Sequence, residues 1–456
     1  MARSRALPLI NVLSATLIAL SLTSAYVTMT VRAQSGAVDP GVRGGPVGAG
    51  QFIPGLTTNQ QTVAQAGKQN FNEINSVQDA SDPGLGPRYD GIHCTSCHAQ
   101  PAFGGSAGFN NGLFQDYQAD GASNYMPFFE VFTGPTLNAR FPQQLANTSL
   151  PDGQVHQLFT IAGRADAGSC SLAQPDFSTA ASENDLTFRS PLPMFGDGLV
   201  EIILERDILA NQAAECAAES TTGICGVPNY TTDGSIGRFG WKAQDRSVLI
   251  FSGEAYQVEQ GVTNEQFPNE NDESQGCVIN PVPEDHSTFG HISFPADFPG
   301  APERFALFTR MLAPPTPAPS NPSTINGQTQ FNKVGCNICH TTSFVTPRSA
   351  IAVLSNVRAN LFSDLLVHHM GPCLADGITQ DSATGDMFRT PPLWGVGQRV
   401  FFLHDGRTLD IVEAVEDHFC TGNGSYPDSE ANAVINSFNA LTTPNQQDLI
   451  NFLRSL

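Results

Sequence analysis

The pentapeptide pattern Cys-x-x-Cys-His occurs twice in this chain, at residues 94–98 and at residues 336–340. Two cysteines at this spacing, followed directly by histidine, are typical of attachment sites for c-type haem. The cysteines can form thioether bonds to the haem vinyl groups, and the histidine can then bind the iron as its proximal ligand. The pattern predicts two covalently bound haem c groups. The attachment residues are Cys94, Cys97, Cys336 and Cys339, with His98 and His340 as proximal ligands.

Other chemistry uses Cys-x-x-Cys as well. One such pair can be a redox dithiol, half of a zinc site or a disulfide, and the four cysteines together could ligate a single zinc ion. A histidine follows the second cysteine in both copies, which zinc does not require. The haem interpretation is therefore favoured, and a zinc-stapled binding protein is a distant alternative.

The N-terminus has the pattern of a secretory signal peptide. Arg3 and Arg5 precede a largely apolar run from about Leu7 to Ala25, and Val31–Ala33 supplies small or aliphatic residues for cleavage. We therefore predict that residues 1–33 are a signal peptide and that the protein is periplasmic or otherwise exported. An uncleaved N-terminal anchor is the alternative. No later stretch approaches the ~20 apolar residues of a membrane span, so we expect none in the mature chain.

Length and charge limit the classes of partner. A chain of 456 residues is long enough for two or three domains. Its formal net charge of −21 argues against nucleic-acid binding through phosphate attraction and disfavours an anionic membrane surface. The same charge suits a basic redox protein, although acidic composition often serves only solubility.

The cysteines outside the two motifs predict disulfides. An even number of them in an exported chain suggests up to three bonds. Cys216 and Cys225 are close enough in sequence to close a small loop, and Cys373 and Cys420 would tie the C-terminal domain. Six cysteines allow fifteen pairings, so the sequence leaves the connectivity open. The six are Cys170, Cys216, Cys225, Cys277, Cys373 and Cys420.

Composition divides the chain into segments with one haem motif in each half. After the signal peptide we expect a flexible lead-in at 34–80, a haem domain with insertions at 81–312, a Pro-rich linker at 313–327 and a C-terminal cytochrome c domain at 328–456. The end of the chain predicts an amphipathic helix. Thr443 is its expected N-cap and Pro444 its first residue. Its apolar stripe consists of Leu449, Ile450, Leu453 and Leu456.

Several further segments resemble one family. They are residues 97–105, 195–201, 237–243, 261–265, 362–371, 389–397, 402–407 and 412–418. Their residues and order are similar to those of the dihaem oxidoreductase family, once labelled thiol oxidoreductases. That family is related to bacterial dihaem cytochrome c peroxidases and to the dihaem enzyme that matures the tryptophylquinone cofactor. The resemblance covers roughly residues 80–456. It implies a mainly α fold with two cytochrome c-like haem domains and long loop-rich insertions in the N-terminal half.

The sixth iron ligands decide between electron transfer and chemistry at the iron, because an open position is needed for peroxide to bind. His418 stands where the related peroxidases carry a distal methionine, so the resemblance marks it as the ligand of the second haem. A surface or core histidine near Cys420 is the alternative. For the first haem, no histidine lies between His98 and His156. His156 is the leading candidate and Met194 the next; if neither binds, the first haem has an open site.

The resemblance also suggests residues around the haems. His404 aligns with a histidine near the distal pocket of the peroxidases, and we expect it to orient groups or accept protons. His369 and Met370 are further pocket candidates. Arg389 and Arg407 can bind haem propionates through paired hydrogen bonds, with surface salt bridges as the alternative.

Two other residues complete the candidate site. Trp241 is placed to lie between the haems and shorten the electron path, or else it is a packed aromatic. Glu201 is an acid that could move peroxide protons. The peroxidase relatives hold calcium between their halves. No dense loop of oxygen ligands marks such a site in this sequence, so calcium is a less favoured further cofactor beside the two haems.

These features lead to three hypotheses of function. The first is an exported dihaem enzyme that reduces peroxide or a related small oxidant with electrons from a small donor protein, a cytochrome or a cupredoxin. The second is a dihaem electron-transfer cytochrome without a substrate pocket. The third is an oxidase of a thiol or a protein side chain. Spin state separates the first from the second, and a substrate screen separates the first from the third.

Overall fold

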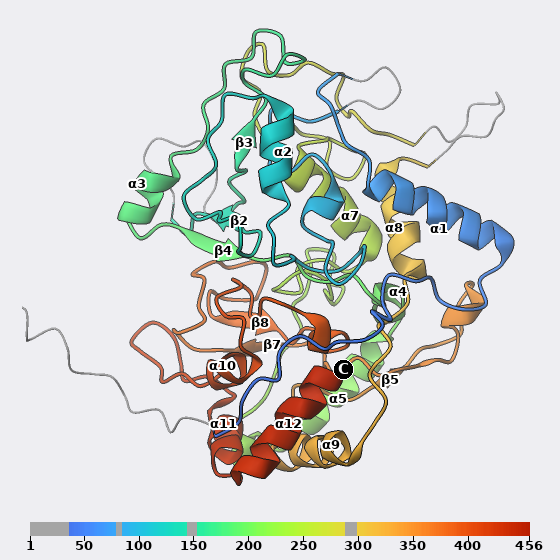
Figure 1. The fold of residues 1–456 in the computed structure, drawn as a ribbon, viewed down its shortest axis with the longest axis vertical. Helices are drawn as coiled ribbons and strands as arrows, with labels where there is room; N and C mark the ends of the chain where they lie inside the picture. The colour runs from blue at the N-terminus through green and yellow to red at the C-terminus, as the bar shows by residue number, and fades with distance from the viewer. Residues whose placement is uncertain (1–35, 79–83, 144–152, 288–298) are drawn as a thin grey trace, which may run out of the picture.

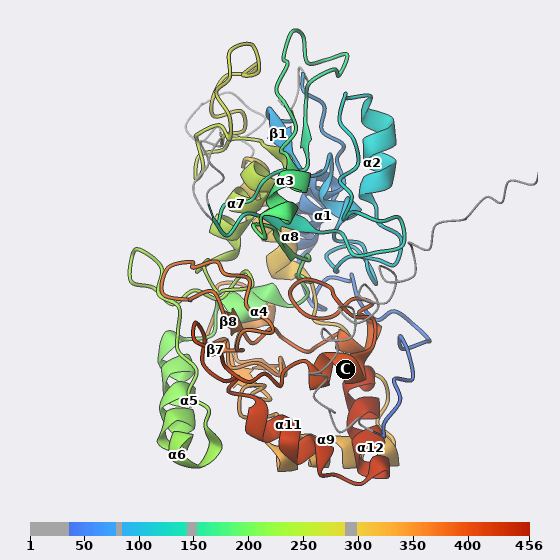
Figure 2. The same cartoon turned by 90° about the vertical axis from the view of Figure 1, so that its left-hand side faces the viewer.

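The computed structural model of the protein describes residues 36–78, 84–143, 153–287 and 299–456. The predicted signal peptide at 1–33 lies outside these residues. Figures 1 and 2 show two lobes stacked along the long axis. The regular structure of the described residues is mainly helical, together with four two-stranded antiparallel sheets. Within the same residues, no helix is both long and apolar enough to cross a membrane.

The upper lobe is built mainly from residues 58–190 and 248–311. Its helices are α1 (Thr58–Phe71), α2 (Leu113–Asp120), α3 (Phe177–Ser182), α7 (Val248–Gln260) and α8 (Ala301–Met311). Its strands are β1 (Arg88–Tyr89), which pairs with β3 (Phe159–Thr160), and β2 (Asn138–Arg140), which pairs with β4 (Thr187–Arg189). Helix α8 packs against both α1 and α7.

The lower lobe contains the second Cys-x-x-Cys-His motif. Its helices are α4 (Asp197–Glu201), α5 (Glu205–Ala217), α6 (Glu219–Thr222), α9 (Pro322–Val334), α10 (Ile411–Glu416), α11 (Asn432–Asn439) and α12 (Thr443–Ser455). Its strands are β5 (Phe344–Val345) with β6 (Arg358–Ala359), and β7 (Val367–His369) with β8 (Met387–Arg389). Helices α9 and α12 lie side by side and enclose much of its core.

Helix α12 follows the predicted apolar stripe. Leu449, Ile450, Leu453 and Leu456 are all buried in one cluster with residues of α9 and α11. The N-cap is Thr442 rather than Thr443, one residue earlier than expected, and Pro444 lies in the first turn. Pro444 fits either N-cap assignment, because proline is tolerated in the first turn, where its missing N–H would have no helical partner.

The expectation of a loosely packed lead-in is wrong for residues 58–71, which form α1. Thr57 and Gln60 make a reciprocal capping box, in which each side chain accepts a backbone N–H of the other residue. The helix buries Ala64 and Phe71. Polar composition hid this helix because only one narrow face of it contacts the protein.

The segment before α1 is also fixed, since it crosses to the lower lobe. The guanidinium of Arg454 in α12 donates to Asp39 with an Nε–Oδ1 distance of 2.8 Å. The backbone N–H of Arg43 donates to the Gly397 carbonyl at 2.8 Å. These contacts attach the first described residues to the C-terminal helix.

The Pro-rich segment is shorter than predicted and is not a free hinge. Helix α9 begins at Pro322, with Asn321 as its N-cap, so the linker ends before residue 327. Thr316 donates its N–H to the Gly48 carbonyl at 2.8 Å, and Ala318 donates to the Ser455 carbonyl at 2.7 Å. Pairing with two other segments holds the prolines against the protein surface.

Residues 81–312 do not form one spatial unit. Helices α5 and α6 lie in the lower lobe, beside the C-terminal part of the chain (Figure 2). Val227 forms a β-bridge with Val367, and Ile208 and Ile236 are buried in one cluster with Leu361. The boundary predicted from composition therefore misassigned α5 and α6, since long-range packing decides which lobe an inserted helix joins.

Three disulfides tie the loops. They join Cys170 to Cys277, Cys216 to Cys225 and Cys373 to Cys420. The last two are the pairings suggested by sequence separation. The four cysteines of the Cys-x-x-Cys-His motifs take no part in these disulfides.

The close packing of α9 on α12 gives a test of the fold. A Cβ atom at Gly327 would lie 1.9 Å from the Asp448 carbonyl oxygen of α12, so Gly327→Ala forces the two helices apart. We expect the free energy of unfolding to fall by about 1–3 kcal/mol, measured by urea denaturation of the haem-loaded protein. Gln328→Ala, at an exposed position of the same helix, should leave stability nearly unchanged. Equal stability of the Gly327→Ala variant would show that the helices are not this close.

Candidate functional site

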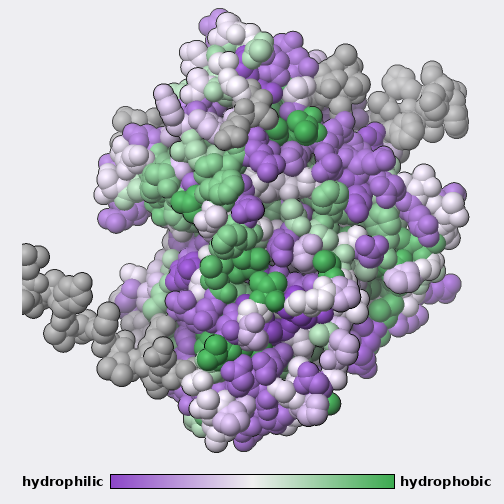
Figure 3. All heavy atoms as spheres, in the orientation of Figure 1, coloured by the Kyte–Doolittle hydropathy of each residue, from purple (hydrophilic) through white to green (hydrophobic). Residues whose placement is uncertain are grey.

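A large apolar cavity surrounds the second Cys-x-x-Cys-His motif. Its volume is about 220 Å³, and Cys336, Cys339 and His340 line it. His418, far away in the sequence, lines the same cavity. Apolar side chains form most of the remaining wall, including those of Phe331, Phe388, Leu393, Phe402, Leu449 and Leu453. Figure 3 shows hydrophobic residues gathered across the middle of one face of the molecule, at the level where the two lobes meet.

The two histidines of this cavity present the same nitrogen to it. The Nδ1–H of His340 donates to the Phe362 carbonyl at 3.0 Å, and the Nδ1–H of His418 donates to the Ala414 carbonyl at 2.7 Å. Each bond leaves Nε2 as the nitrogen that can bind a metal. Burial lowers the pKa of both rings, and for His340 burial and the proximity of His418 lower it to about 3. Both imidazoles are therefore neutral at physiological pH, as iron ligation requires.

Two arginines line the cavity without an ion-pair partner among the described residues. The Nε–H of Arg389 donates to the Gly240 carbonyl at 2.9 Å, and that of Arg399 donates to the Phe401 carbonyl at 2.6 Å. Burial lowers the pKa of each guanidinium to about 10. Buried cations need an anionic partner. Haem propionates would supply one.

Arg399 was missed by the sequence interpretation, and Arg407 lies elsewhere. The guanidinium of Arg407 donates to Asp405 and to the Cys373 carbonyl, and it is absent from the described cavity wall. Arg399 belongs to no sequence motif that would have marked it as a site residue. Only the fold reveals that its side chain lines the cavity.

Trp241 and His404 form another part of the same wall. Their rings meet edge to face at 6.2 Å, and His404 stacks on Phe388 at 4.3 Å. The indole N–H of Trp241 donates to the Ser190 carbonyl at 2.8 Å, which fixes the ring. Burial lowers the pKa of His404 to about 4. The structure thus brings these two predicted residues together beside the second motif.

The same cavity extends to the loop that follows the first motif. Gln100, Pro101 and Ser106 contribute to its wall. Gln100 lies two positions after His98 in the sequence. The two motifs therefore approach each other at the boundary of the lobes, near Trp241.

The first motif begins with a short 3₁₀ helix over Cys94–Ser96. The Nδ1–H of His98 donates to the Gly105 carbonyl at 2.9 Å, as in the second motif, and burial lowers its pKa. Cys94 packs against a buried cluster of Phe71, Phe195, Tyr256, Val262, Phe305, Phe308 and Leu312. This apolar setting and the orientation of His98 fit a haem held by the first motif.

The two candidates for the sixth ligand of the first haem have different surroundings. Met194 packs in the cluster that contains Cys94. His156 stacks on Phe141, with ring centroids 3.6 Å apart. Burial, together with the nearby Arg88 and Arg140, lowers the His156 pKa to about 4.

Buried acids near the first motif were not found from the sequence. Burial raises the pKa of Glu130 to about 8, and its carboxylate accepts hydrogen bonds from the Leu137 N–H and the Asn111 amide. Burial and mutual repulsion raise the pKa of Asp90 beside Glu259. After burial, the charges of these acids also raise the pKa of Cys97. No sequence pattern links these acids, because they come from separate loops and from α7.

Glu201 and His369 are absent from the described cavity wall. Glu201 makes a two-pronged ion pair with Arg310, at 2.6 and 2.8 Å, and accepts the Val248 N–H. His369 pairs with Asp386 at 2.8 Å, whereas its neighbour Met370 does line the cavity. Glu201 is therefore bound in a structural ion pair.

Comparison with known proteins gives one family. The family described as "Di-haem oxidoreductase, putative peroxidase" matches residues 147–456, a range that includes the second motif and not the first. No curated protein matches the chain.

Two solved structures show partial likeness. One is hydrazine synthase from Kuenenia stuttgartiensis, pressurized with xenon, with 18% identity and a TM-score of 0.23 over 34% of this chain and 55% of that chain. The other is a MauG-like protein associated with microbial copper homeostasis, with 18% identity and a TM-score of 0.24 over 34% of this chain and 52% of that chain. The chain thus covers about half the length of each, and TM-scores this low do not bear on its fold.

The unpaired arginines lead to a test of the cavity. We expect Arg399→Gln to lower the reduction potential of one haem, because removing a buried positive charge disfavours the electron-rich reduced state. A spectroelectrochemical titration of the haem-loaded protein measures this. Arg407→Gln, which removes a charge outside the described cavity wall, should leave both potentials nearly unchanged. Equal potentials in wild type and Arg399→Gln would contradict the role of Arg399 beside a haem.

Proposed function

The chain belongs to the di-haem oxidoreductase family, and from that we propose that it is an exported enzyme that reduces peroxide with electrons from a small redox protein. Haem, when bound, supplies the redox chemistry, and the chain supplies ligands, orientation and proton transfer. The two Cys-x-x-Cys-His motifs support covalent attachment of both groups.

The observation that carries the proposal is the shared cavity of His340 and His418. His340 and His418 would hold the iron of a haem bound in this cavity, and an iron held by two strong ligands suits electron transfer. We therefore assign the second motif to electron transfer and the first motif to the reaction with peroxide. Trp241, fixed by Ser190 at the boundary of the lobes, lies beside the path between them.

Glu130 is our proposed proton acceptor at the first motif. Cleavage of an O–O bond needs a group that takes one peroxide proton and returns it to the leaving oxygen. A carboxylate with a pKa of about 8 exchanges protons near physiological pH. The Asn111 amide donates to Glu130, and the next residue, Gly112, packs against the backbone of Ser96 inside the motif. Glu130 is therefore linked to the first motif through residues 111 and 112. This role replaces the one suggested for Glu201, whose carboxylate is paired with Arg310.

Export and the electron donor are supported indirectly. Three disulfides in the described chain suit an oxidising compartment. The net charge of −21 suits a basic donor protein, such as a small cytochrome or cupredoxin.

A second candidate function is electron transfer alone. The same pairing of His340 and His418 favours it for the second motif, and Met194 or His156 would need to close the first iron as well. A dihaem protein with both irons six-coordinate would carry electrons without a substrate site.

The two functions give different spectra. We expect the half-reduced protein to show a high-spin haem signal that disappears rapidly after one equivalent of hydrogen peroxide. Absorption spectroscopy in a stopped-flow instrument measures it. Two low-spin haems that do not respond to peroxide would exclude the peroxidase function and support electron transfer.

His418 can be tested separately. His418→Ala should convert the second haem from low-spin to high-spin, because it removes one of two strong ligands. Electron paramagnetic resonance of the oxidised protein detects the change. His286→Ala, at an exposed position of the upper lobe, serves as the control. An unchanged low-spin signal in His418→Ala would show that another residue binds this iron.

The proton role of Glu130 predicts a pH dependence. Only its ionised form can accept a proton, so the rate constant for peroxide reaction should rise with pH through about 8 and then level off. We expect Glu130→Gln to lower the rate roughly 10²–10⁴-fold and to abolish this rise. Stopped-flow measurements from pH 6 to 9 test both, with Glu183→Gln at an exposed position as the control. A rise that persists in Glu130→Gln would assign the proton transfer to another group.

A further inference from the structure

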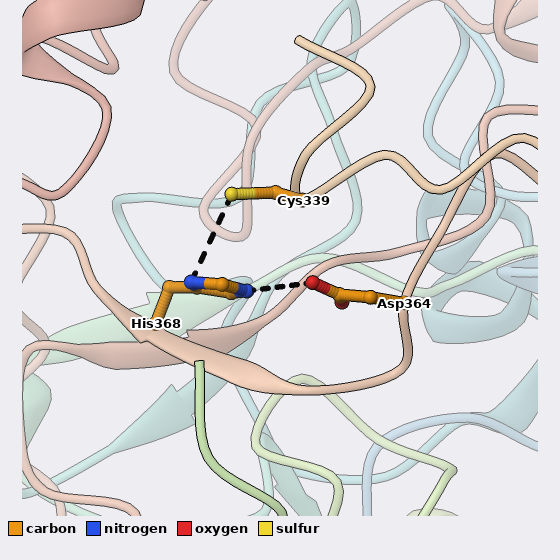
Figure 4. Close-up of side chains that lie close together, drawn as sticks. All are labelled: Cys339, Asp364 and His368. Atoms are coloured by element: carbon orange, nitrogen blue, oxygen red, sulfur yellow. Dashed lines mark hydrogen bonds and ion pairs between the residues drawn. The ribbon is translucent and has the colours of Figure 1, made fainter. Parts of the chain in front are cut away.

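A buried histidine lies among three carboxylates beside the second motif. The Nε2 atom of His368 is 2.8 Å from Asp364 Oδ2, as Figure 4 shows. On the other side of the ring, Nδ1 is 2.8 Å from Glu430 Oε2 and 3.9 Å from Glu215 Oε1. The side chains of His368 and Glu215 are each only 3% exposed.

The two glutamates are held firmly in place. The Gly226 N–H donates to Glu215 Oε1 at 2.6 Å, and the Cys225 N–H donates to Glu430 Oε2 at 3.2 Å. The disulfide between Cys216 and Cys225 fixes the loop that supplies both N–H groups. The carboxylates therefore face His368 from a rigid frame.

The hydrogen bonds within the cluster do not satisfy every carboxylate oxygen. Glu215 Oε2 is buried and has no hydrogen-bond partner among the residues that the structure describes. Even with His368 protonated at both ring nitrogens, as its bonds to Asp364 and Glu430 require, three ionised carboxylates leave an excess of negative charge in a buried site, which is costly unless a further cation balances it. Both observations point to a missing positively charged ligand.

We propose that Glu215, His368 and Glu430 form a binding site for a divalent first-row metal ion, with Zn²⁺ as the probe. Zinc bonds of about 2.1 Å place two ligands of a tetrahedral ion roughly 3.4 Å apart. The separations of 2.8 and 3.9 Å from Nδ1 lie on either side of that value. Glu215 Oε2 is free to bind as a further ligand atom.

Asp364 completes the arrangement from the opposite side of the ring. Metal-binding histidines usually donate their other ring N–H to a carboxylate, which fixes the tautomer and raises the basicity of the ligand. Asp364 is fully buried and accepts from Nε2, so Nδ1, which pairs with Glu430 at 2.8 Å, is the nitrogen that would exchange its proton for the metal. Asp364 is therefore a positioning residue.

The ligand set selects among cations. Calcium and magnesium prefer sites made of oxygen alone, so the imidazole disfavours them. Cys339 Sγ lies 3.8 Å from His368 Nδ1, but its motif commits that sulfur to haem attachment. Imidazole with carboxylates suits zinc and its neighbours in the first transition row.

The test uses the haem-loaded protein without an affinity tag. Equilibrium dialysis against ZnCl₂, followed by elemental analysis, should give one zinc for every two haem irons. We expect Glu215→Gln and Glu430→Gln to weaken zinc binding at least tenfold and Asp364→Asn to weaken it roughly 10–100-fold. Asp207→Asn, on the same helix as Glu215 and outside the cluster, should bind zinc like the wild type.

Two results would overturn the proposal. One is the absence of saturable zinc binding to the wild type. The other is equal affinity in wild type and Glu215→Gln, which would indicate adventitious surface binding. Should Glu215→Gln fail to fold, judged by its haem absorbance, the Asp364→Asn variant decides by the same criterion. Iron content and peroxide reactivity are measured independently, so failure of this proposal is distinguishable from failure of the proposed function.

Discussion

A hydrogen bond from Nδ1–H to a backbone carbonyl orients each of the three histidines that we propose as haem ligands. His98, His340 and His418 donate to the carbonyls of residues 105, 362 and 414. The bond keeps Nε2 as the nitrogen available to iron and fixes the plane of the ring. Burial keeps each ring neutral, since charging a buried imidazole is costly. The apolar cavity therefore keeps the rings neutral, while the loops that supply the carbonyls orient them.

The stacking of the two lobes determines where the first motif lies relative to the second. Residues of the first-motif loop enter the wall of the second cavity, and Trp241 lies in the same wall. The N-terminal segment through Asp39 and the Pro-rich segment through Ala318 both bind the C-terminal end of α12, at Arg454 and Ser455. Because these contacts are spread over several segments, they fix the relative position of the lobes. That position is therefore part of the site.

The apolar stripe of α12 was predicted correctly because it depends on local spacing, whereas haem attachment at the two motifs stays a prediction. Local composition failed where distant contacts mattered. It suggested a loose lead-in where α1 forms, and it assigned α5 to the wrong lobe. Arg399 and Glu130 were missed because their importance comes from burial, which no short pattern in the sequence records.

The sequence by itself determined the residues of both Cys-x-x-Cys-His motifs, and with them the expected cofactor, because a covalent attachment needs a fixed spacing along the chain. It also singled out His418 through resemblance to a family. Only the tertiary structure brought His418 into one cavity with His340, and only it gathered Glu215, His368 and Glu430. Those groups lie far apart along the chain, and their chemistry depends on distance and burial in three dimensions.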